Sequence, residues 1–217
     1  MAEKIEILHR GEGFAVVNKP VGADSEDKGE GSVPFLVKEV LGISYAAPCH
    51  RLDKAVGGAM LVSTDERKTA FLCNSVKEHK IEKEYICVCE GIFPEDEQRG
   101  IMRDILFFDR SRKKSFTVKK ARKGTKEASL EYEVLEAAEA PDGKPLSLVR
   151  VKLHTGRTHQ IRVQFASRRH SLCGDGKYGS HDNGCTVALH CLSVTVDGVR
   201  VSCPPERKYP FDLFRID

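Results

Sequence analysis

Pro48-Cys-His-Arg-Leu-Asp-Lys-Ala-Val-Gly-Gly-Ala-Met-Leu-Val-Ser63 is the stretch of sequence around which the rest of the chain is organised. The apolar run from Ala59 to Val62 predicts a buried strand. Gly57-Gly58 predicts a sharp bend, because glycine reaches φ values that other residues avoid. Asp53 is therefore expected in a loop at a strand edge, where rigid structure would hold a reactive carboxylate toward open space. The simpler interpretation is that Asp53 only caps a turn.

The composition is that of an ordinary globular protein. The 217 residues are 31% charged and 40% hydrophobic, and the chain is long enough to bury most of its apolar surface as one generous domain or two small ones. No apolar run approaches the roughly 20 residues that span a bilayer. The first residues lack the basic segment and apolar core of a signal peptide. We therefore expect a cytoplasmic protein that does not bind a membrane.

Eight cysteines are scattered along the chain, without the secretory signal that would favour disulfides. Reduced thiols are therefore expected. Cys87 and Cys89 alternate along a predicted strand, so their side chains should lie on one face. Three cysteines near two histidines would allow a zinc site, formed by Cys185, Cys191, Cys203, His181 and His190. Because no Cys-x-x-Cys pair is present, buried small side chains are the favoured interpretation.

The net charge is +3, but the basic residues are concentrated in one segment. Residues 110–123 contain no acidic residue and eight basic ones, which are Arg110, Arg112, Lys113, Lys114, Lys119, Lys120, Arg122 and Lys123. Alone, this pattern is typical of a solvated strand face. Together with Arg168-Arg169 and Arg150-Val-Lys152, it predicts a surface that binds a polyanion such as RNA.

Periodicity and turn residues predict a chain rich in strands. The expected elements of the first part are a hairpin over 4–9 and 14–18, a helix over 33–41, a helix ending near 79 and a strand over 86–90. Ser63 and Glu66 have the spacing of a capping box, which would start the second helix. Strand-like segments continue at 105–108, 116–120, 130–135 and 146–153, and a hairpin at 192–196 and 199–203. Asp197-Gly198 suits the tight turn of that last hairpin.

No linker, repeat or low-complexity segment interrupts these elements. One continuous domain over residues 1–217 is therefore the simplest interpretation. The fold class expected from the elements is α+β, with a large mixed or antiparallel sheet flanked by helices.

A second informative stretch is Thr155-Gly-Arg-Thr-His-Gln-Ile-Arg-Val163. Gly156 permits a tight turn and Thr158 is a good N-cap, which together predict a helix start. Basic and polar side chains are dense at this start, where unpaired amides already favour anions. Arg162 would lie about one turn into the helix. The alternative is a well-capped helix whose basic residues are solvated.

Taken together, these motifs resemble those of the RNA pseudouridine synthases of the RluA type. The segments that carry the resemblance are Val16–Pro20, His50–Asp53, Lys83–Tyr85 with Gly91, Thr155–Val163, Gly174-Asp175 with Tyr178-Gly179, and Ala188–His190. Several motifs in the right order over nearly the whole chain are far more specific than one. The resemblance implies the family's catalytic fold with an active-site cleft. Because the chain begins directly with that fold, we expect no accessory RNA-binding module of the S4 type, which some relatives carry.

In this family the reaction breaks the bond between uracil N1 and ribose C1′, turns the base and rejoins it through C5, without a cofactor or metal. The resemblance implies that Asp53 is the catalytic carboxylate, acting as a nucleophile at C1′ or as a base toward the sugar. Tyr85 is implied to stack on the target base and to assist removal of the C5 proton. Arg162 is implied to be the family's arginine. A nearby guanidinium favours a charged carboxylate, so Arg162 is expected to keep Asp53 ionised.

The implied substrate is ribosomal or transfer RNA, and no obligate protein partner is implied. A uridine inside folded RNA must leave its stack to react, and the family implies that Arg51 fills the space it leaves. The residues expected to bind the substrate are Arg51, His50, Lys19, Arg157, Thr158, His159 and Gln160.

Two departures from the family pattern concern positioning. Val56-Gly57-Gly58 stands where Thr-Ser-Gly is usual, and Gln164 stands where histidine is usual. An alternative function is therefore a catalytically silent relative that binds or remodels RNA. A weaker alternative is a metal-dependent hydrolase, for which the candidate ligands would be His50, Asp53, His159 and His190. These residues lack the spacing of a helical metal site.

Overall fold

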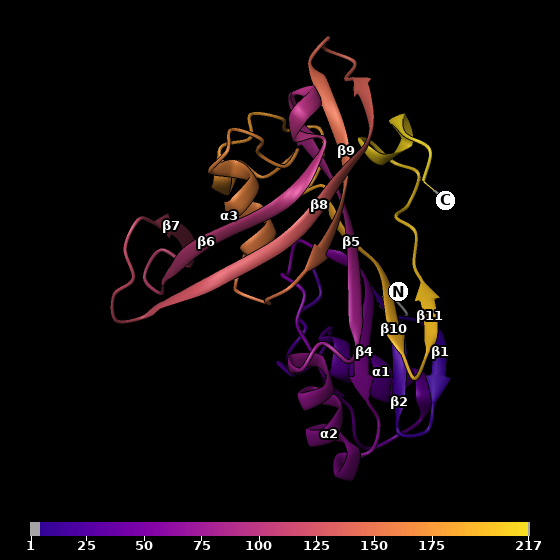
Figure 1. Cartoon of the computed structure of the whole chain (residues 1–217). Helices are drawn as coiled ribbons and strands as arrows, with labels where there is room; N and C mark the ends of the chain where they lie inside the picture. The colour runs from indigo at the N-terminus through magenta and orange to yellow at the C-terminus, as the bar shows by residue number, and fades with distance from the viewer. Residues whose placement is uncertain (1–4, 217) are drawn as a thin grey trace. The chain divides into compact units, whose positions relative to one another are not determined.

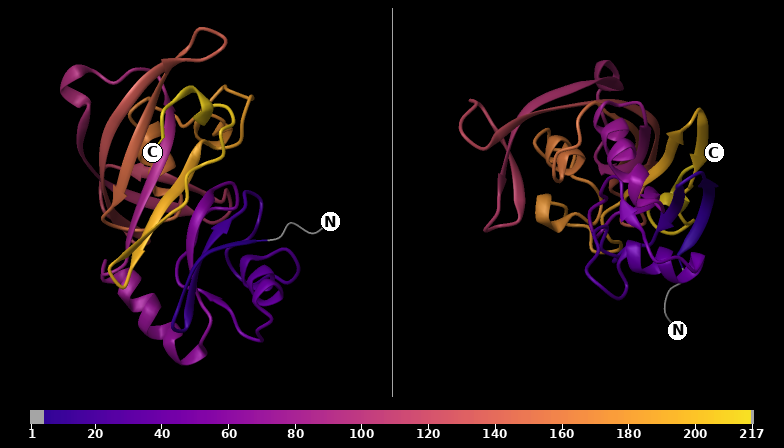
Figure 2. Two further views of the ribbon diagram at one scale, coloured as in Figure 1. Left: turned by 90° about the vertical axis from the view of Figure 1, so that its right-hand side faces the viewer. Right: turned by 90° about the horizontal axis from the view of Figure 1, so that it is seen from below.

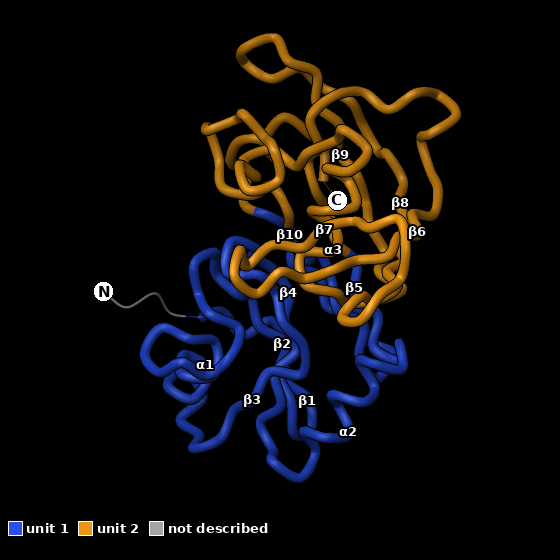
Figure 3. The backbone as a smooth tube through the Cα atoms, turned by 90° about the vertical axis from the view of Figure 1, so that its left-hand side faces the viewer, with its two compact units in different colours: residues 1–84, 190–205 blue, residues 85–189, 206–217 orange. Residues whose placement is uncertain are grey.

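The structure is a computed structural model that describes residues 5–216. The chain forms two compact units that alternate along the sequence (Figure 3). The first unit takes the residues up to 84 and residues 190–205, and the second takes residues 85–189 and those from 206 onward. The prediction of a single catalytic domain over residues 1–217 is not tested by this division and stays a prediction.

The first unit is built on a mixed sheet in the order β1-β2-β4-β10, with β3 paired to β4 and β11 paired to β10. Its strands are β1 (Glu6–Gly11), β2 (Phe14–Lys19), β3 (Ala47–Pro48), β4 (Gly57–Ser63), β10 (Leu189–Val196, whose first residue belongs to the second unit) and β11 (Val199–Ser202). β1, β2 and β4 are antiparallel neighbours, whereas β10 runs parallel to β4. Every residue of β4 is buried, as its continuous apolar sequence predicts.

Two helices belong to the first unit (Figure 1). α1 (Val33–Leu41) has the predicted bounds. α2 (Glu66–Lys77) begins near the predicted residue, but the predicted capping box is wrong. The N-cap is Asp65, whose carboxylate accepts the Arg67 N–H at 3.0 Å. Ser63 is the last residue of β4, and its hydroxyl donates to the carbonyl of Asp65 at 2.9 Å.

The second unit carries strands in the order β5-β9-β8-β6-β7. Their bounds are β5 (Glu82–Glu90, whose first three residues belong to the first unit), β6 (Arg99–Asp109), β7 (Lys114–Val118), β8 (Thr125–Glu139) and β9 (Pro145–Leu153). β9, β8, β6 and β7 pair in antiparallel register. The left view of Figure 2 shows β8 and β9 as long neighbouring strands. The mixed and antiparallel strand pairing of an α+β fold is therefore confirmed.

One helix, α3 (Gln160–Ala166), packs against strands of the second unit. Its Val163 joins a buried apolar cluster with Leu106 of β6, Ala128 of β8 and Tyr178. Fully burying a side chain such as leucine or valine stabilises a fold by about 1.5–3 kcal/mol, so this cluster fixes α3 on the sheet. Short 3-10 helices complete the described chain, namely η1 (Glu95–Glu97), η2 (Gly176–Tyr178) and η3 (Phe211–Leu213).

Several local predictions are confirmed. Cys87 and Cys89 lie on one face of β5, with their sulfur atoms 4.0 Å apart. The β10–β11 hairpin turns at Asp197-Gly198, where both residues have positive φ, as a tight two-residue turn requires. In residues 5–216, no helix is long and apolar enough to cross a membrane.

Candidate active site

Asp53 lies in the loop between β3 and β4, at the edge of the buried strand, as predicted. Its side chain is half-buried, and its carbonyl accepts the Val56 N–H at 2.9 Å, which closes a turn. The preceding residue is fixed from outside the loop. The Leu52 N–H donates to the Ser25 hydroxyl at 3.0 Å, and that hydroxyl donates to the Leu52 carbonyl at 2.7 Å. The backbone on both sides of Asp53 is therefore held.

Lys19 also holds this loop, from the end of β2, where it is 0% exposed. Its ammonium donates to the carbonyls of Pro20 at 3.0 Å, Lys54 at 3.5 Å and Val56 at 2.8 Å. Because an ammonium has three N–H donors and no acceptor, these three carbonyls use its full capacity. That Lys19 binds the substrate stays a prediction; in the structure its donors are directed to the carbonyls of Pro20, Lys54 and Val56.

The charge of Lys19 matters for the electrostatics of this loop. Burial lowers the pKa of Lys19 to about 8, and the negative charges of Asp53 and Asp24 oppose that shift. A carboxylate is a favourable neighbour for an ammonium whose carbonyl partners carry only partial charges. The first unit thus places a cation near Asp53 that titrates close to neutral pH.

His50 and Arg51 differ sharply in their surroundings. The Leu61 N–H donates to His50 Nε2 at 3.0 Å. That nitrogen must therefore be unprotonated, and the neutral ring carries its proton on Nδ1. Burial keeps the pKa of His50 well below its usual range, which favours the same neutral form. Arg51 is exposed, and its guanidinium pairs with Glu26 at 3.0 Å, so of the two side chains it is the more accessible to a ligand.

Two glycines, Gly57 and Gly58, begin β4 directly after the Asp53 loop. Gly58 has φ +112°, and a Cβ there would lie 2.3 Å from the carbonyl oxygen of Cys191 on β10. Only glycine permits this approach of two backbones. At Gly57 a Cβ would lie 3.2 Å from the Lys19 carbonyl, which is tight but not prohibitive. The departure from the family pattern at Gly57 therefore lies directly against the residue that holds the Asp53 loop.

Tyr85 and Arg162 belong to the second unit. Tyr85 is buried on β5. Arg162 is buried on α3, where its guanidinium forms a side-on pair with Asp175. Arg162 Nε donates to Asp175 Oδ2 at 2.6 Å, and Nη2 donates to Oδ1 at 2.8 Å. A bidentate pair of this kind fixes the plane of the guanidinium as well as its position.

Tyr178 packs against the face of the same guanidinium. The Arg162 Cζ lies 5.1 Å from the centroid of the Tyr178 ring, within the range of a cation–π contact. The Tyr178 hydroxyl accepts the Ser115 N–H at 2.8 Å and lies 2.9 Å from His159 Nδ1. Burial raises the pKa of Tyr178 to about 12, so this hydroxyl stays protonated at neutral pH.

The residues before α3 are organised by Gln160 rather than by Thr158. The predicted Thr158 N-cap is wrong, because His159 precedes the helix in a left-handed conformation, with φ 54°. Gln160 Oε1 accepts the Thr155 hydroxyl at 2.7 Å and the Arg157 N–H at 3.0 Å. Its Nε2 donates to the Ser129 carbonyl at 3.1 Å. Gln160 therefore joins this loop to β8 by hydrogen bonds within the protein. Because α3 is short, its helix dipole adds little to the binding of an anion at its N-terminus.

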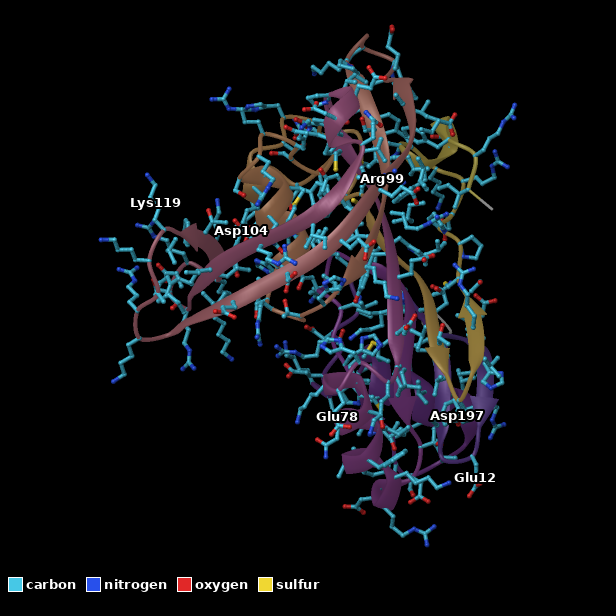
Figure 4. All side chains as sticks on the ribbon, viewed as in Figure 1. Glu12, Glu78, Arg99, Asp104, Lys119 and Asp197 are labelled. Carbon is cyan, nitrogen blue, oxygen red and sulfur yellow. The ribbon has the colours of Figure 1, made fainter. Side chains whose placement is uncertain are left out.

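The basic residues cluster at the ends of β7. The turns on either side of β7 expose the cations Arg110, Arg112, Lys113, Lys119, Lys120, Arg122 and Lys123. Figure 4 shows Lys119 at the outer rim of this hairpin, with its side chain extending from the ribbon. Lys114 is anchored by donating to the Lys177 carbonyl, and Lys177 donates to the Lys113 carbonyl at 3.2 Å. A fixed hairpin thus carries a dense positive surface.

The zinc and hydrolase hypotheses have no support in the geometry. In the described part of the chain, no three His, Cys, Asp or Glu side chains are grouped so that they could hold a metal ion. Sequence reasoning gave Asp175 and Tyr178 no role, although both lie in the glycine-punctuated segment it singled out. The available signals were that both residues belong to a segment of the family resemblance and that glycines flank them, which indicates a turn but not its partner.

Comparison with known proteins identifies relatives of the chain. The family model described as RNA pseudouridylate synthase matches residues 13–167. An RNA pseudouridine synthase of Aquifex aeolicus is 34% identical over 185 residues, which are 81% of this chain and 56% of that protein. The tRNA pseudouridine synthase C of Haemophilus ducreyi is 28% identical over 191 residues, 83% of this chain and 76% of that protein.

Among solved structures, human RNA pseudouridylate synthase domain containing 1 is similar in fold. The TM-score is 0.79 at 24% identity, and the match covers 97% of this chain and 86% of that chain. Some curated relatives are considerably longer. The chain spans 56% of the Aquifex aeolicus protein and 58% of a similar protein from Bacillus subtilis.

Proposed function

Because the chain belongs to the RNA pseudouridylate synthase family, we propose that it is an isomerase that converts specific uridines of ribosomal or transfer RNA to pseudouridine. The match over residues 13–167 carries this proposal. It includes Asp53, Tyr85 and Arg162, to which we assign the catalytic roles. The name of the Haemophilus ducreyi relative supports transfer RNA as one substrate class.

The proposed reaction needs no external reagent. The N1–C1′ glycosidic bond breaks, the uracil turns, and a C5–C1′ bond forms. The proton on C5 is lost and N1 ends protonated, so atoms and electrons balance within one nucleotide. Asp53 acts at the sugar as nucleophile or base, Tyr85 stacks on the base, and Arg162 supplies a fixed positive charge.

The contacts that fix the Asp53 loop favour a catalytic role for Asp53 over the interpretation that Asp53 only caps a turn. A turn cap needs only local hydrogen bonds. Here a buried ammonium is committed to the carbonyls of Lys54 and Val56, on the far side of Asp53 from the Ser25 contact. Burying a charge to hold this loop costs free energy, and a carboxylate that must be placed accurately gives a reason for that cost.

The decisive test is tritium release from RNA labelled at uridine C5. Wild-type protein should release tritium from ribosomal or transfer RNA isolated from cells that lack the gene. Asp53→Asn should release none above background while binding RNA as tightly as wild type. Asp142→Asn is the matched control, because it makes the same change in an exposed carboxylate that pairs with Lys144 outside the first unit, and it should release tritium like wild type. Full activity of Asp53→Asn would refute the assignment of Asp53.

The catalytically silent alternative is separated by the same assay. A protein that only holds or remodels RNA would bind RNA but release no tritium from any cellular RNA. Mapping pseudouridine in RNA from cells with and without the gene then names the modified position, since a single site that disappears on deletion identifies the substrate.

The exposed cations in the turns on either side of β7 form a basic surface, which we call the β7 hairpin surface. We propose that this surface binds phosphates and so positions the RNA without reading its sequence. Replacing Lys119, Lys120 and Lys123 by glutamine should weaken RNA binding and reduce the salt slope by roughly 0.7–0.9 for each phosphate that the protein no longer neutralises. The control replaces Lys28, Lys80 and Lys208, whose ammonium groups already pair with carboxylates at 2.9, 2.7 and 2.5 Å. If both triple variants change the salt slope equally, the hairpin is not the binding surface.

A further inference from the structure

Asp175 is a buried carboxylate of the second unit that pairs with the guanidinium of Arg162. Its side chain is 1% exposed, and it faces an Arg162 side chain that is 7% exposed. A guanidinium stays protonated at any pH that a folded protein tolerates, so burying it without a carboxylate would be very costly. Asp175 removes that cost and binds two of the five guanidinium N–H groups, through the Nε–Nη2 edge.

The turn that carries Asp175 is built independently of Arg162. Gly174 has φ +73°, and a Cβ there would lie 2.3 Å from the Thr186 carbonyl oxygen. The Asp175 N–H donates to the Leu172 carbonyl at 3.0 Å, and the Asp175 carbonyl accepts the Tyr178 N–H at 2.9 Å. Ser180 also donates its N–H to that carbonyl, at 3.1 Å. The carboxylate is thus presented by backbone that does not depend on the ion pair.

The same turn supplies the ring beneath the guanidinium. Tyr178 lies three residues after Asp175, and its hydroxyl is fixed by the Ser115 N–H. Arg162 therefore meets one turn on two sides, with a carboxylate at its edge and an aromatic ring at its face. Two such contacts leave the side chain little freedom to rotate, so the three N–H groups that Asp175 does not bind are presented in a fixed direction.

We propose that Asp175 is a positioning residue for the reaction, which acts by orienting the guanidinium of Arg162 while the Tyr178 ring supports it. This inference rests on the proposed function, because it gives Arg162 a task in the isomerisation. It predicts that loss of the carboxylate lowers the rate of the chemical step without weakening RNA binding. It also predicts that Asp175 has no effect of its own once Arg162 is removed.

The test measures single-turnover tritium release against enzyme concentration, which separates the rate constant at saturation from the half-saturating concentration. Asp175→Asn should lower the rate constant by about 100-fold, the order of loss expected from a misplaced catalytic group. The half-saturating concentration should stay within about threefold of wild type. In an Arg162→Lys background, Asp175→Asn should change the rate little, because the two residues act as one unit.

Asp104→Asn is the matched control. Asp104 pairs with Arg168 at 2.9 Å and accepts from Gln164 at 2.7 Å, so it anchors the same stretch of chain without touching Arg162. Asp104→Asn should keep its rate within about threefold of wild type. If it loses as much as Asp175→Asn, the effect is placement of α3 and the inference fails. A wild-type rate in Asp175→Asn also overturns it.

A second variant and a second readout guard against unfolding and against failure of the proposed function. If Asp175→Asn does not fold, Asp175→Glu keeps the buried charge but moves the carboxylate, and a wild-type rate in that variant overturns the inference. Proton exchange at Arg162 Nε, followed by NMR, should be slow in wild type and fast in Asp175→Asn or Asp175→Glu. Slow exchange in the variant that folds overturns the inference even if no RNA is turned over, whereas absence of tritium release from wild type overturns the proposed function.

Discussion

Each unit secures one charged residue to which we assign a catalytic role, and the two units do so by opposite means. In the first unit a buried cation, Lys19, holds backbone carbonyls of the loop that carries Asp53. In the second unit a buried anion, Asp175, holds the side chain of Arg162 itself. The first arrangement fixes the place of a carboxylate through its backbone, and the second fixes the direction of a guanidinium through its donors.

The compensation of buried charge also differs. Lys19 is solvated by carbonyl dipoles, and burial lowers its pKa to about 8. Arg162 faces a full negative charge and cannot lose its proton at accessible pH. The anchor of the first unit is therefore titratable near neutral pH, whereas the anchor of the second is not. This difference predicts that sensitivity to pH above neutrality originates in the Asp53 loop.

The largest expected effect is that of Lys19→Met, which removes the ammonium and with it the donor to the buried Val56 carbonyl, whereas the carbonyls of Lys54 and Pro20 keep the N–H groups of Gly22 and Ala23. Each hydrogen bond to a charged group contributes roughly 1.5–3 kcal/mol, so the free energy of unfolding should fall by about 2–4 kcal/mol. The loosened Asp53 loop should lower the single-turnover rate by about 100-fold. Urea unfolding and tritium release measure the two effects.

Lys54→Met is the control for that variant, because the Lys54 side chain is 67% exposed and pairs with a surface carboxylate. It should change the free energy of unfolding by no more than about 0.5 kcal/mol. Equal stability of the two variants would mean that the Lys19 bonds do not hold the loop, and the contrast between the units would disappear.

Gly58→Ala tests the strand behind the loop and should have the next largest effect. Its Cβ would lie 2.3 Å from the Cys191 carbonyl oxygen in a backbone conformation that alanine rarely adopts. Strain and overpacking together should lower the free energy of unfolding by about 3 kcal/mol. Gly57→Ala, whose Cβ would meet the Lys19 carbonyl at 3.2 Å, should cost less than half as much. A reversed order in urea unfolding would contradict this account of the glycine pair.

Local features of the fold could be predicted from the sequence. The bounds of α1 follow from apolar spacing, and Asp197-Gly198 specifies a tight turn whatever lies around it. The placement of Asp53 beside β4 follows from a buried run next to glycines. These are short-range signals, so the surrounding structure has little opportunity to override them.

The contacts that hold the site could not be predicted, because they join distant residues. Lys19 binds the carbonyl of Val56, which lies 37 residues further along the chain, and Arg162 pairs with Asp175, which lies 13 residues away. The Thr158 prediction failed for a related reason. A good N-cap residue was present, but the left-handed backbone at His159 and the Gln160 bonds to β8 set the helix start.

The smallest expected effect is on pH dependence, and it separates the two anchors directly. Below pH 8 Lys19 is charged in the folded and unfolded states, whereas between about pH 8 and its ordinary pKa of 10.5 the folded state has released a proton that the unfolded state keeps. Stability from this group therefore rises with pH in that window. The neutral amine has two N–H donors for three carbonyls, however, so the loop loosens.

The single-turnover rate should accordingly fall about tenfold between pH 7 and pH 9, as the charged fraction falls with a pKa of about 8. The fall should reverse on returning to pH 7, and thermal unfolding should show no loss of stability from Lys19 over this range. The Lys19→Met variant should react more slowly than wild type over the whole pH range, and its rate should show no such fall, or step, between pH 7 and pH 9. Asp175→Asn should keep the step, because its defect lies in the anchor that does not titrate. A wild-type rate that stays flat to pH 9, or a step that survives in Lys19→Met, would place the titrating group elsewhere and remove the distinction between the anchors.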